Sequence, residues 1–209
     1  MSFGRTDAAA DATKSTTRLQ FVIHTFTARY LGVEDRVRLD CVDVEGAQQC
    51  ILLTRRLTHR VVPAISNQLD QKIPEGMPRD LAQDMRQESA RQQRSSGGSL
   101  RPVVPEEQSP TWLCITVHIK KTEDGAFILV FTDDQSVDAR IRMIEENFRA
   151  FLDILHDMHT QAGWGVECFP EWYERRRPES VGTHALNWGL AEGHWPAPRS
   201  HMLCSPSRR

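Results

Sequence analysis

Residues 112–163 read WLCITVHIKKTEDGAFILVFTDDQSVDARIRMIEENFRAFLDILHDMHTQAG and contain the clearest fold signal in the chain. Trp112 to Lys121 alternates apolar with polar residues, as a half-buried strand does. The sequence Glu123-Asp124-Gly125 is typical of a hairpin turn, and the apolar run Ala126 to Thr132 follows it. Ala139 to Ile144 predicts a third strand, so this stretch begins as an antiparallel sheet.

A helix is predicted directly after these strands, from a cap at Asn147 to about Ala162. Gly163 ends it, because glycine adopts the left-handed conformation of a helix C-terminus at little cost. The apolar face repeats with the 3.6-residue period of a helix. That face contains Phe148, Phe151, Leu152, Leu155, His159 and Ala162.

The same order of elements is predicted near the N-terminus, with strands at 19–23, 37–41 and 50–54. A helix follows, with Thr54 as its cap and an apolar stripe at every fourth residue from Leu57 to Leu69. Pro63 lies inside the stripe and lacks a backbone N–H, so we expect a kink or a split near Val62.

The chain therefore reads strand, strand, strand, helix twice, which predicts an α+β fold from two pattern-repeated units. The units are expected to form one antiparallel sheet or a partly open barrel with both helices on one face. An internal duplication and chance repetition both remain open. The predicted boundaries are a flexible N-terminus (1–15), a first unit (16–75), a polar linker (76–110), a second unit (111–175) and an extended tail (176–209).

The linker and the tail differ in composition from the two units. Residues 76–110 are rich in Gln, Arg, Ser, Gly and Pro, and contain at most a polar helix over 79–94 that Met77, Leu81 and Met85 could anchor. After Gly163, aromatic residues stand among Gly, Pro and Arg without periodicity. We expect the part up to Tyr173 to pack on the second unit and the rest to be extended.

Composition favours a cytoplasmic protein, and the distribution of charge argues against nucleic-acid binding. The chain has 209 residues, 39% of them hydrophobic, and no apolar run of about 18 residues that could span a membrane. Residues 111–175 contain 6 basic and 12 acidic side chains (6 − 12 = −6), and residues 176–209 contain 5 and 2 (5 − 2 = +3). An acidic unit opposes phosphate binding.

The five cysteines have no C-x-x-C spacing and are odd in number, which favours reduced thiols over a disulfide framework. Cys41, Cys50 and Cys114 lie in apolar strand patterns and are expected to fill the core. No catalytic signature is present. The acidic doublets Asp133-Asp134 and Glu145-Glu146 suit a turn and a helix start better than catalysis.

Two groups of metal-ligand side chains remain as candidates, and neither is favoured. One is on the second helix, where His156 and His159 are three residues apart but Asp153 and Asp157 are expected on the wet face. The other is in the tail. It consists of His184, His194, His201 and Cys204 at irregular spacing. We therefore expect no metal, no cofactor and no catalytic residues.

The leading prediction is a non-enzymatic accessory or adaptor protein, a subunit or assembly factor that binds a protein partner with its tail and sheet surface. Aromatic and arginine side chains anchor protein interfaces, and the C-terminal region is rich in both. The candidate partner-binding residues are Trp172, Tyr173, Arg175, Arg176, Arg177, Trp188 and Trp195.

The alternative prediction is single-stranded nucleic-acid binding. The order of sheet units, each closed by a helix, resembles in outline the duplicated strand-and-helix modules of the PUR and Whirly single-strand-binding proteins. That resemblance is architectural and carries over no motif residue. The candidate phosphate contacts come from the basic side chains of the two units. They are Arg55, Arg56, Arg60, Lys120, Arg140 and Arg142.

Overall fold

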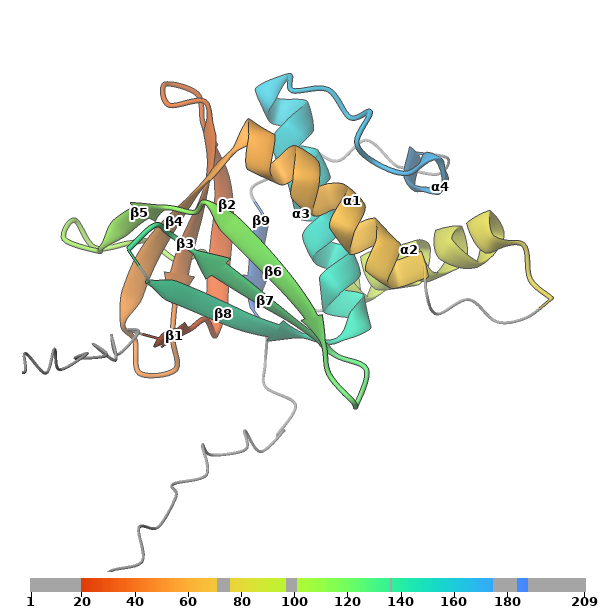
Figure 1. Ribbon diagram of the computed structural model, residues 1–209, viewed down its shortest axis with the longest axis horizontal. Helices are drawn as coiled ribbons and strands as arrows, with labels where there is room; N and C mark the ends of the chain where they lie inside the picture. The colour runs from red at the N-terminus through yellow and green to blue at the C-terminus, as the bar shows by residue number, and fades with distance from the viewer. Residues whose placement is uncertain (1–19, 71–75, 97–100, 136, 175–183, 188–209) are drawn as a thin grey trace, which may run out of the picture.

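The computed structural model describes residues 20–70, 76–96, 101–135, 137–174 and 184–187, and its fold is α+β (Figure 1). The strands are β1 (Gln20–Val22), β2 (Thr25–Leu31), β3 (Arg36–Val42), β4 (Gln48–Thr54), β5 (Thr111–Leu113), β6 (Thr116–Lys121), β7 (Phe127–Thr132), β8 (Asp138–Met143) and β9 (His184–Asn187). The helices are α1 (Arg55–Asp70), α2 (Arg79–Ser96), α3 (Glu145–Ala162) and α4 (Glu171–Glu174). The predicted fold class is confirmed.

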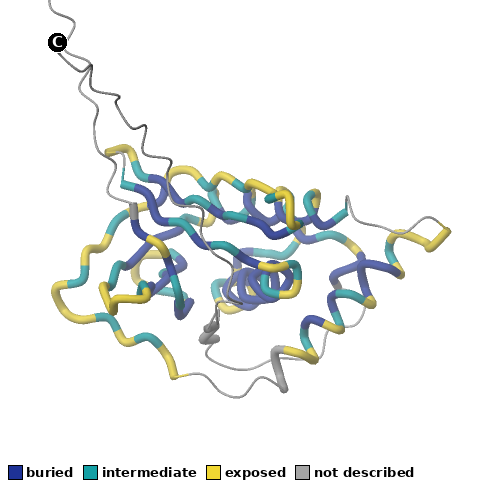
Figure 2. Tube along the Cα trace, turned by 90° about the horizontal axis from the view of Figure 1, so that it is seen from below, coloured by how far each residue is buried: buried dark blue, intermediate teal, exposed yellow. Residues whose placement is uncertain are grey.

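The strands form two mixed sheets, with no closed barrel among the described residues. One sheet has the order β1-β8-β7-β6 and the other the order β5-β4-β3-β2-β9. Buried residues lie along the strands and helices and exposed ones mainly in the connecting loops (Figure 2). The inner faces of both sheets share a single apolar core with α1 and α3.

Each sheet contains one short strand from the other half of the chain. β1 pairs in parallel with β8, and β5 pairs in parallel with β4. The β2-β3-β4 and β6-β7-β8 pairs are antiparallel. Two mixed sheets therefore stand in place of the expected single antiparallel sheet, because β1 and β5 cross between the halves. The halves at 16–75 and 111–175 are thus joined through their sheets as well as through their core, while duplication of sequence stays a prediction.

The number of strands differs from the prediction because one predicted strand is two, and because β2 and β9 were not predicted. The predicted 112–121 strand is β5 and β6, separated at Cys114 and Ile115. The region around 19–23 contains β1, and β2 follows after only Ile23 and His24. Each short break lets the chain cross from one sheet to the other, which an alternating pattern alone does not reveal.

The helix α1 begins at the predicted cap, where Thr54 Oγ1 accepts a hydrogen bond from the Leu57 N–H at 3.2 Å. It continues through Pro63 to Asp70, so the predicted split is wrong. Val62, Ile65 and Leu69 are fully buried on either side of the proline. Burial of this stripe compensates for the missing hydrogen bond of Pro63.

The helix α3 ends as predicted but begins earlier. Gly163 has φ 64° and caps the C-terminus. The N-cap is Ile144, which makes no side-chain capping bond, so the prediction of Asn147 as the cap is wrong. Glu145 and Glu146 occupy the first turn, where negative charge is favourable to the helix dipole.

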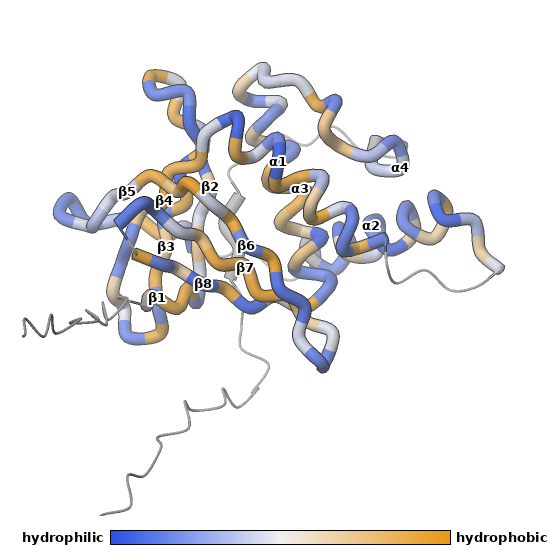
Figure 3. The backbone as a smooth tube through the Cα atoms, in the orientation of Figure 1, coloured by the Kyte–Doolittle hydropathy of each residue, from blue (hydrophilic) through white to orange (hydrophobic). Residues whose placement is uncertain are grey.

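The predicted polar helix in the linker is confirmed as α2, but its anchors differ from those expected. Met77, Leu81 and Met85 are 41%, 43% and 55% exposed. Ala82, Gln83, Gln87 and Ala90 are buried instead. Figure 3 shows α2 as largely hydrophilic. It docks through hydrogen bonds to α3, which a search for apolar anchors does not detect.

The segment after α3 packs on the second half, as predicted up to Tyr173. Trp164, Phe169, Trp172 and Tyr173 are all buried. Further along, β9 pairs antiparallel with β2 at the edge of the five-stranded sheet. No helix in the described ranges is long and apolar enough to span a membrane.

Candidate functional site

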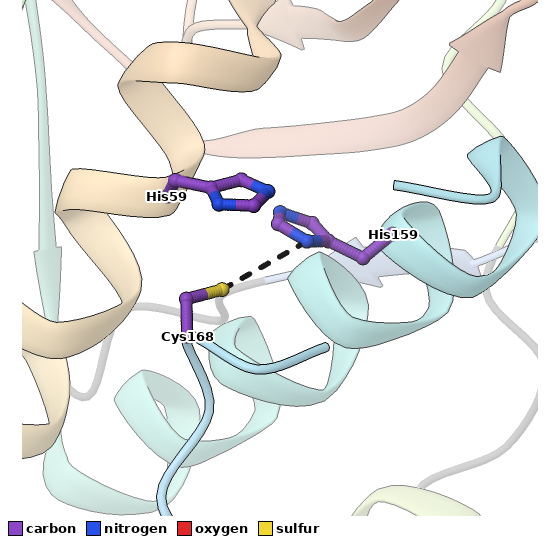
Figure 4. Close-up of side chains that lie close together, drawn as sticks. All are labelled: His59, His159 and Cys168. Atoms are coloured by element: carbon purple, nitrogen blue, oxygen red, sulfur yellow. Dashed lines mark hydrogen bonds between the residues drawn. The ribbon is translucent and has the colours of Figure 1, made fainter. Parts of the chain in front are cut away.

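Two histidines and a cysteine from three separate segments meet between α1 and α3 (Figure 4). The ligand atoms of His59, His159 and Cys168 all lie within 4.8 Å of one another. The imidazole rings stack with centroids 4.9 Å apart, and Cys168 Sγ is 3.9 Å from His159 Nδ1. These are two imidazoles and a thiol, the donor types that soft and borderline metals prefer.

Local structure explains how the three side chains meet. His59 follows the capped first turn of α1, and His159 lies in the last turn of α3. The left-handed Gly163 reverses the chain after α3, and the buried Trp164 and Phe169 hold the returning loop against it. Cys168 is therefore brought back beside His159.

The ring of His159 is hydrogen-bonded on both sides. Nδ1 lies 3.1 Å from the Gly165 carbonyl oxygen, and Nε2 lies 3.0 Å from Thr58 Oγ1. Burial lowers the pKa of His159, which favours the neutral ring, and burial raises the pKa of the Cys168 thiol. By contrast, Nε2 of His59 is buried and has no hydrogen-bond partner among the residues that the structure describes.

A basic depression of about 470 Å³ opens beside His59 at the start of α1. Arg55, Arg56, His59 and Arg60 line it, and the three arginines are exposed. The N-terminal turn of α1 contains no acidic residue. This surface brings together three of the six predicted phosphate contacts.

The other three predicted phosphate contacts lie together elsewhere, on the open face of the four-stranded sheet. In the strand register Lys120 is opposite Ile128, and Ile128 is opposite Arg142, while Arg140 is opposite Val130. Arg140 is 3.7 Å from Asp138, and Arg142 is paired with Asp124. The two ion pairs reduce the positive charge of this face.

A small apolar groove of about 210 Å³ lies between α1 and β6. Leu57, Val61 and Ala64 line it from α1, and Ile115, Val117 and Ile119 line it from β6 and the residue before it. Ile115 is 52% exposed. Arg60 also lines the groove, which therefore adjoins the basic depression.

The predicted partner-binding residues are only partly placed. Trp172 and Tyr173 are 4% and 1% exposed, and Tyr173 donates a hydrogen bond to Asp153. Both rings belong to the core and are unavailable to a partner in this structure, because the segment folds back against α3. The other five predicted contacts, in the arginine run and the tail, lie outside the described residues. These are Arg175, Arg176, Arg177, Trp188 and Trp195.

The side chains of the metal group predicted on α3 each bond to other partners and do not meet at one point. Asp153 binds Arg91 at 3.2 Å and Tyr173, while His156 Nδ1 lies 3.3 Å from Thr160 Oγ1. Asp153 and Asp157 are buried, so their predicted exposure is wrong. The helix α2 packs on α3, and Tyr173 of α4 bonds to Asp153. For the tail group, no side chain is described.

The acidic doublets have structural partners. Asp133 Oδ1 accepts hydrogen bonds from the N–H groups of Gln135 and Val137 in a turn, and Glu145 pairs with Arg149 at 3.0 Å. The buried thiols of Cys41, Cys50 and Cys114 confirm the core-filling prediction.

Sequence reasoning did not connect His59 and Cys168 with His159. His59 stands within a basic stretch with Arg55, Arg56 and Arg60, and Cys168 stands nine positions after His159 with no motif between them. The available signal was Gly163, since a left-handed glycine at a helix end reverses the chain and returns the following residues towards the last turn.

Comparisons with protein-family models, with curated proteins and with solved structures give no match.

Proposed function

We propose that the protein is a non-enzymatic adaptor that binds an extended segment of a partner protein along the edge strand β6. The observation that supports this proposal is that β6, the edge strand of the four-stranded sheet, lines the apolar groove beside α1. An extended segment added to such an edge gains main-chain hydrogen bonds, and pockets beside the edge select its side chains.

The hydrogen-bond pattern of β6 indicates which groups are available. The Thr122 N–H donates to the Ala126 carbonyl at 2.8 Å, and the same register continues along β6 and β7. Bonded and non-bonded pairs alternate in an antiparallel ladder, so every second residue directs its N–H and C=O away from β7. In β6 these residues are Val117, Ile119 and Lys121.

The groove indicates the chemistry of the partner segment. Val117 and Ile119 lie on its floor, while Arg60 and the exposed Lys121 stand near them. A complementary segment has apolar residues at alternate positions and a carboxylate close to the two cations. We therefore propose an acidic, amphipathic strand as the ligand, with residues 176–209 as a second contact region.

Lys121→Pro tests the edge, because it removes an outward N–H and leaves the pairing with β7 intact. Lys121→Ala is the matched control, since it removes the same side chain but keeps the N–H. Affinity capture from the native host, followed by mass spectrometry, should identify a stoichiometric partner with the wild type and with Lys121→Ala. Loss of that partner only with Lys121→Pro is expected; equal capture by both variants would contradict the edge proposal.

The tail is tested separately. Deletion of residues 178–209 should weaken capture of the same partner, because it removes Trp188 and Trp195. This deletion also removes β9, so thermal melting has to accompany the capture measurement. Unchanged capture by the truncated chain would assign binding to β6 alone.

Single-stranded nucleic acid is the second candidate ligand, favoured by the clustering of Lys120, Arg140 and Arg142 on one sheet face. Fluorescence anisotropy with a single-stranded oligonucleotide tests it. Binding should weaken with salt, and Lys120→Ala should reduce the salt slope by about 1. Absence of binding at low salt would eliminate this candidate. The cytoplasm remains the proposed compartment, on the basis of the odd number of cysteines and their lack of C-x-x-C spacing.

A further inference from the structure

We propose that His59, His159 and Cys168 bind one zinc ion. Zn²⁺ takes nitrogen ligands at about 2.0–2.1 Å and a thiolate at about 2.3 Å, which places tetrahedral ligand atoms roughly 3.3–3.8 Å apart. The Cys168 Sγ and His159 Nδ1 atoms are already 3.9 Å apart, and the widest separation in the set is within 4.8 Å. Closure needs about 1 Å, which side-chain torsions of His59 and Cys168 supply.

The buried Nε2 of His59 is the second observation that points to a ligand. It has no hydrogen-bond partner among the described residues, although leaving a buried polar atom unsatisfied is unfavourable. The ring is stacked on His159, with 25° between the ring planes, and both imidazoles lie beside Cys168 (Figure 4). A metal ion would satisfy the buried nitrogen.

The surroundings of His159 suit a metal-bound ring. Thr58 Oγ1 donates its single proton to the Arg55 carbonyl at 2.9 Å, so towards His159 it can accept a hydrogen bond from Nε2–H. In that tautomer Nδ1 has the lone pair and faces Cys168. A ring whose far N–H is fixed by an oxygen acceptor is the usual arrangement of metal-binding histidines.

Binding changes the protonation of the ligands in a balanced way. The Cys168 thiol gives its proton to solvent and binds as thiolate. In the metal-free protein the Gly165 carbonyl accepts from Nδ1, so the single proton of the neutral His159 ring is on Nδ1. Zinc takes the place of that proton at Nδ1 and the ring takes up a proton at Nε2, where Thr58 Oγ1 accepts it, so the ring stays neutral. Glu167 and Arg55 have opposite electrostatic effects on the site. The negative charge of Glu167 favours a bound cation, and the positive charge of Arg55 opposes it.

Three protein ligands leave a fourth position open on a tetrahedral zinc. His59 is also part of the basic depression with Arg55, Arg56 and Arg60. The fourth position therefore takes water or an anionic oxygen from that side. This site is separate from the β6 edge, and its test does not depend on the proposed partner.

The test uses the full chain with the tail donors replaced, as His184→Ala, His194→Ala, His201→Ala and Cys204→Ser, so that zinc in the tail does not contribute. Isothermal titration with zinc should show one site per chain. Cys168→Ser and His59→Asn should each weaken it by at least about 100-fold, since replacing even an outer partner costs about 10–100-fold. Thr58→Val, which removes such a partner, should cost about 10–100-fold.

His118→Asn is the matched control, because His118 is exposed on β6 and away from the site. It should bind zinc like the background protein. Cobalt titration of the same background protein gives a spectroscopic readout beside the zinc affinity. A thiolate-to-cobalt charge-transfer band should appear in the background protein, disappear in Cys168→Ser and persist in Thr58→Val. Absence of zinc binding, absence of the band, or zinc binding unchanged in both Cys168→Ser and His59→Asn would overturn the proposal.

Discussion

Arg149 of α3 is 1% exposed, and its Nη2 donates a hydrogen bond to Gln83 Oε1 of α2 at 2.7 Å. The same guanidinium pairs with Glu145, while Gln87 Nε2 donates to the Arg149 carbonyl at 3.1 Å. Burial lowers the pKa of Arg149, and the ion pair with Glu145 opposes that shift. The polar helix α2 is thereby fixed to the core through a buried cation.

Gln83→Ala should destabilise the protein by about 1–3 kcal/mol, because it removes a buried hydrogen bond to a charged group. Gln92→Ala is the matched control, because Gln92 is exposed on the same helix and should change stability by less than about 0.5 kcal/mol. Urea unfolding followed by circular dichroism measures both. Equal stability of the two variants would show that α2 is not held by this contact.

Asp35 should make stability depend on acid pH. Its Oδ1 accepts hydrogen bonds from Tyr30 Oη at 2.7 Å and from Trp164 Nε1 at 2.6 Å. These two bonds, led by that from Tyr30, lower the pKa of Asp35 in the folded protein. The resulting stabilisation is present above the unfolded-state pKa of about 3.9 and is lost as the pH falls through the lower folded-state pKa.

Asp35→Asn removes the titration and keeps a residue that tolerates the observed φ of 52°. The difference in melting temperature between wild type and Asp35→Asn should therefore be largest near neutral pH and shrink below about pH 4. Thermal melts across this range measure it. A difference that does not vary with pH would mean that the carboxylate is not stabilised by Tyr30 and Trp164.

The sequence was sufficient for the local elements and insufficient for their partners. The hairpin turn at Gly125, the Thr54 cap and the Gly163 C-cap depend on a few neighbouring residues, so pattern reasoning found them. The parallel pairing of β1 with β8 depends on residues more than a hundred positions apart. Such pairings leave no periodic trace in either strand.

The candidate metal site escaped prediction for a related reason. His159 was recognised on its helix, but its partners come from another helix and from a returning loop. The sequence favours Trp172 and Tyr173 as partner contacts because the C-terminal region is rich in aromatic and arginine side chains. Their burial depends on α2 and α3, which close over the segment. A linear pattern cannot distinguish an aromatic that docks on its own chain from one that docks on a partner.

Gly163→Ala should destabilise the protein by about 1–2 kcal/mol, which is the cost of placing an L residue in the left-handed region. No atom lies within 4 Å of the added Cβ, so the effect is confined to the backbone. Gly32→Ala is the control, because Gly32 lacks a positive φ and its Cβ would meet only Tyr30 at 3.8 Å. Chemical unfolding should separate the two variants; equal stability would mean that the cap at α3 is dispensable.

The two halves should fold only together. The β1 strand belongs to the sheet of the second half and β5 to that of the first, and Phe26 packs edge-on against Phe151 with ring centroids 5.8 Å apart. Residues 16–96, which keep α2, and residues 111–175, expressed separately, each lack a sheet strand and the opposing half of the core, so neither should unfold cooperatively. Mixing or co-expressing them should restore a heterodimer with a cooperative melt, which size-exclusion chromatography and calorimetry would detect. A sharp unfolding transition from either fragment alone, as a monomer, would contradict this prediction. That fragment would then be an independently folding domain that does not need the strand supplied by the other half.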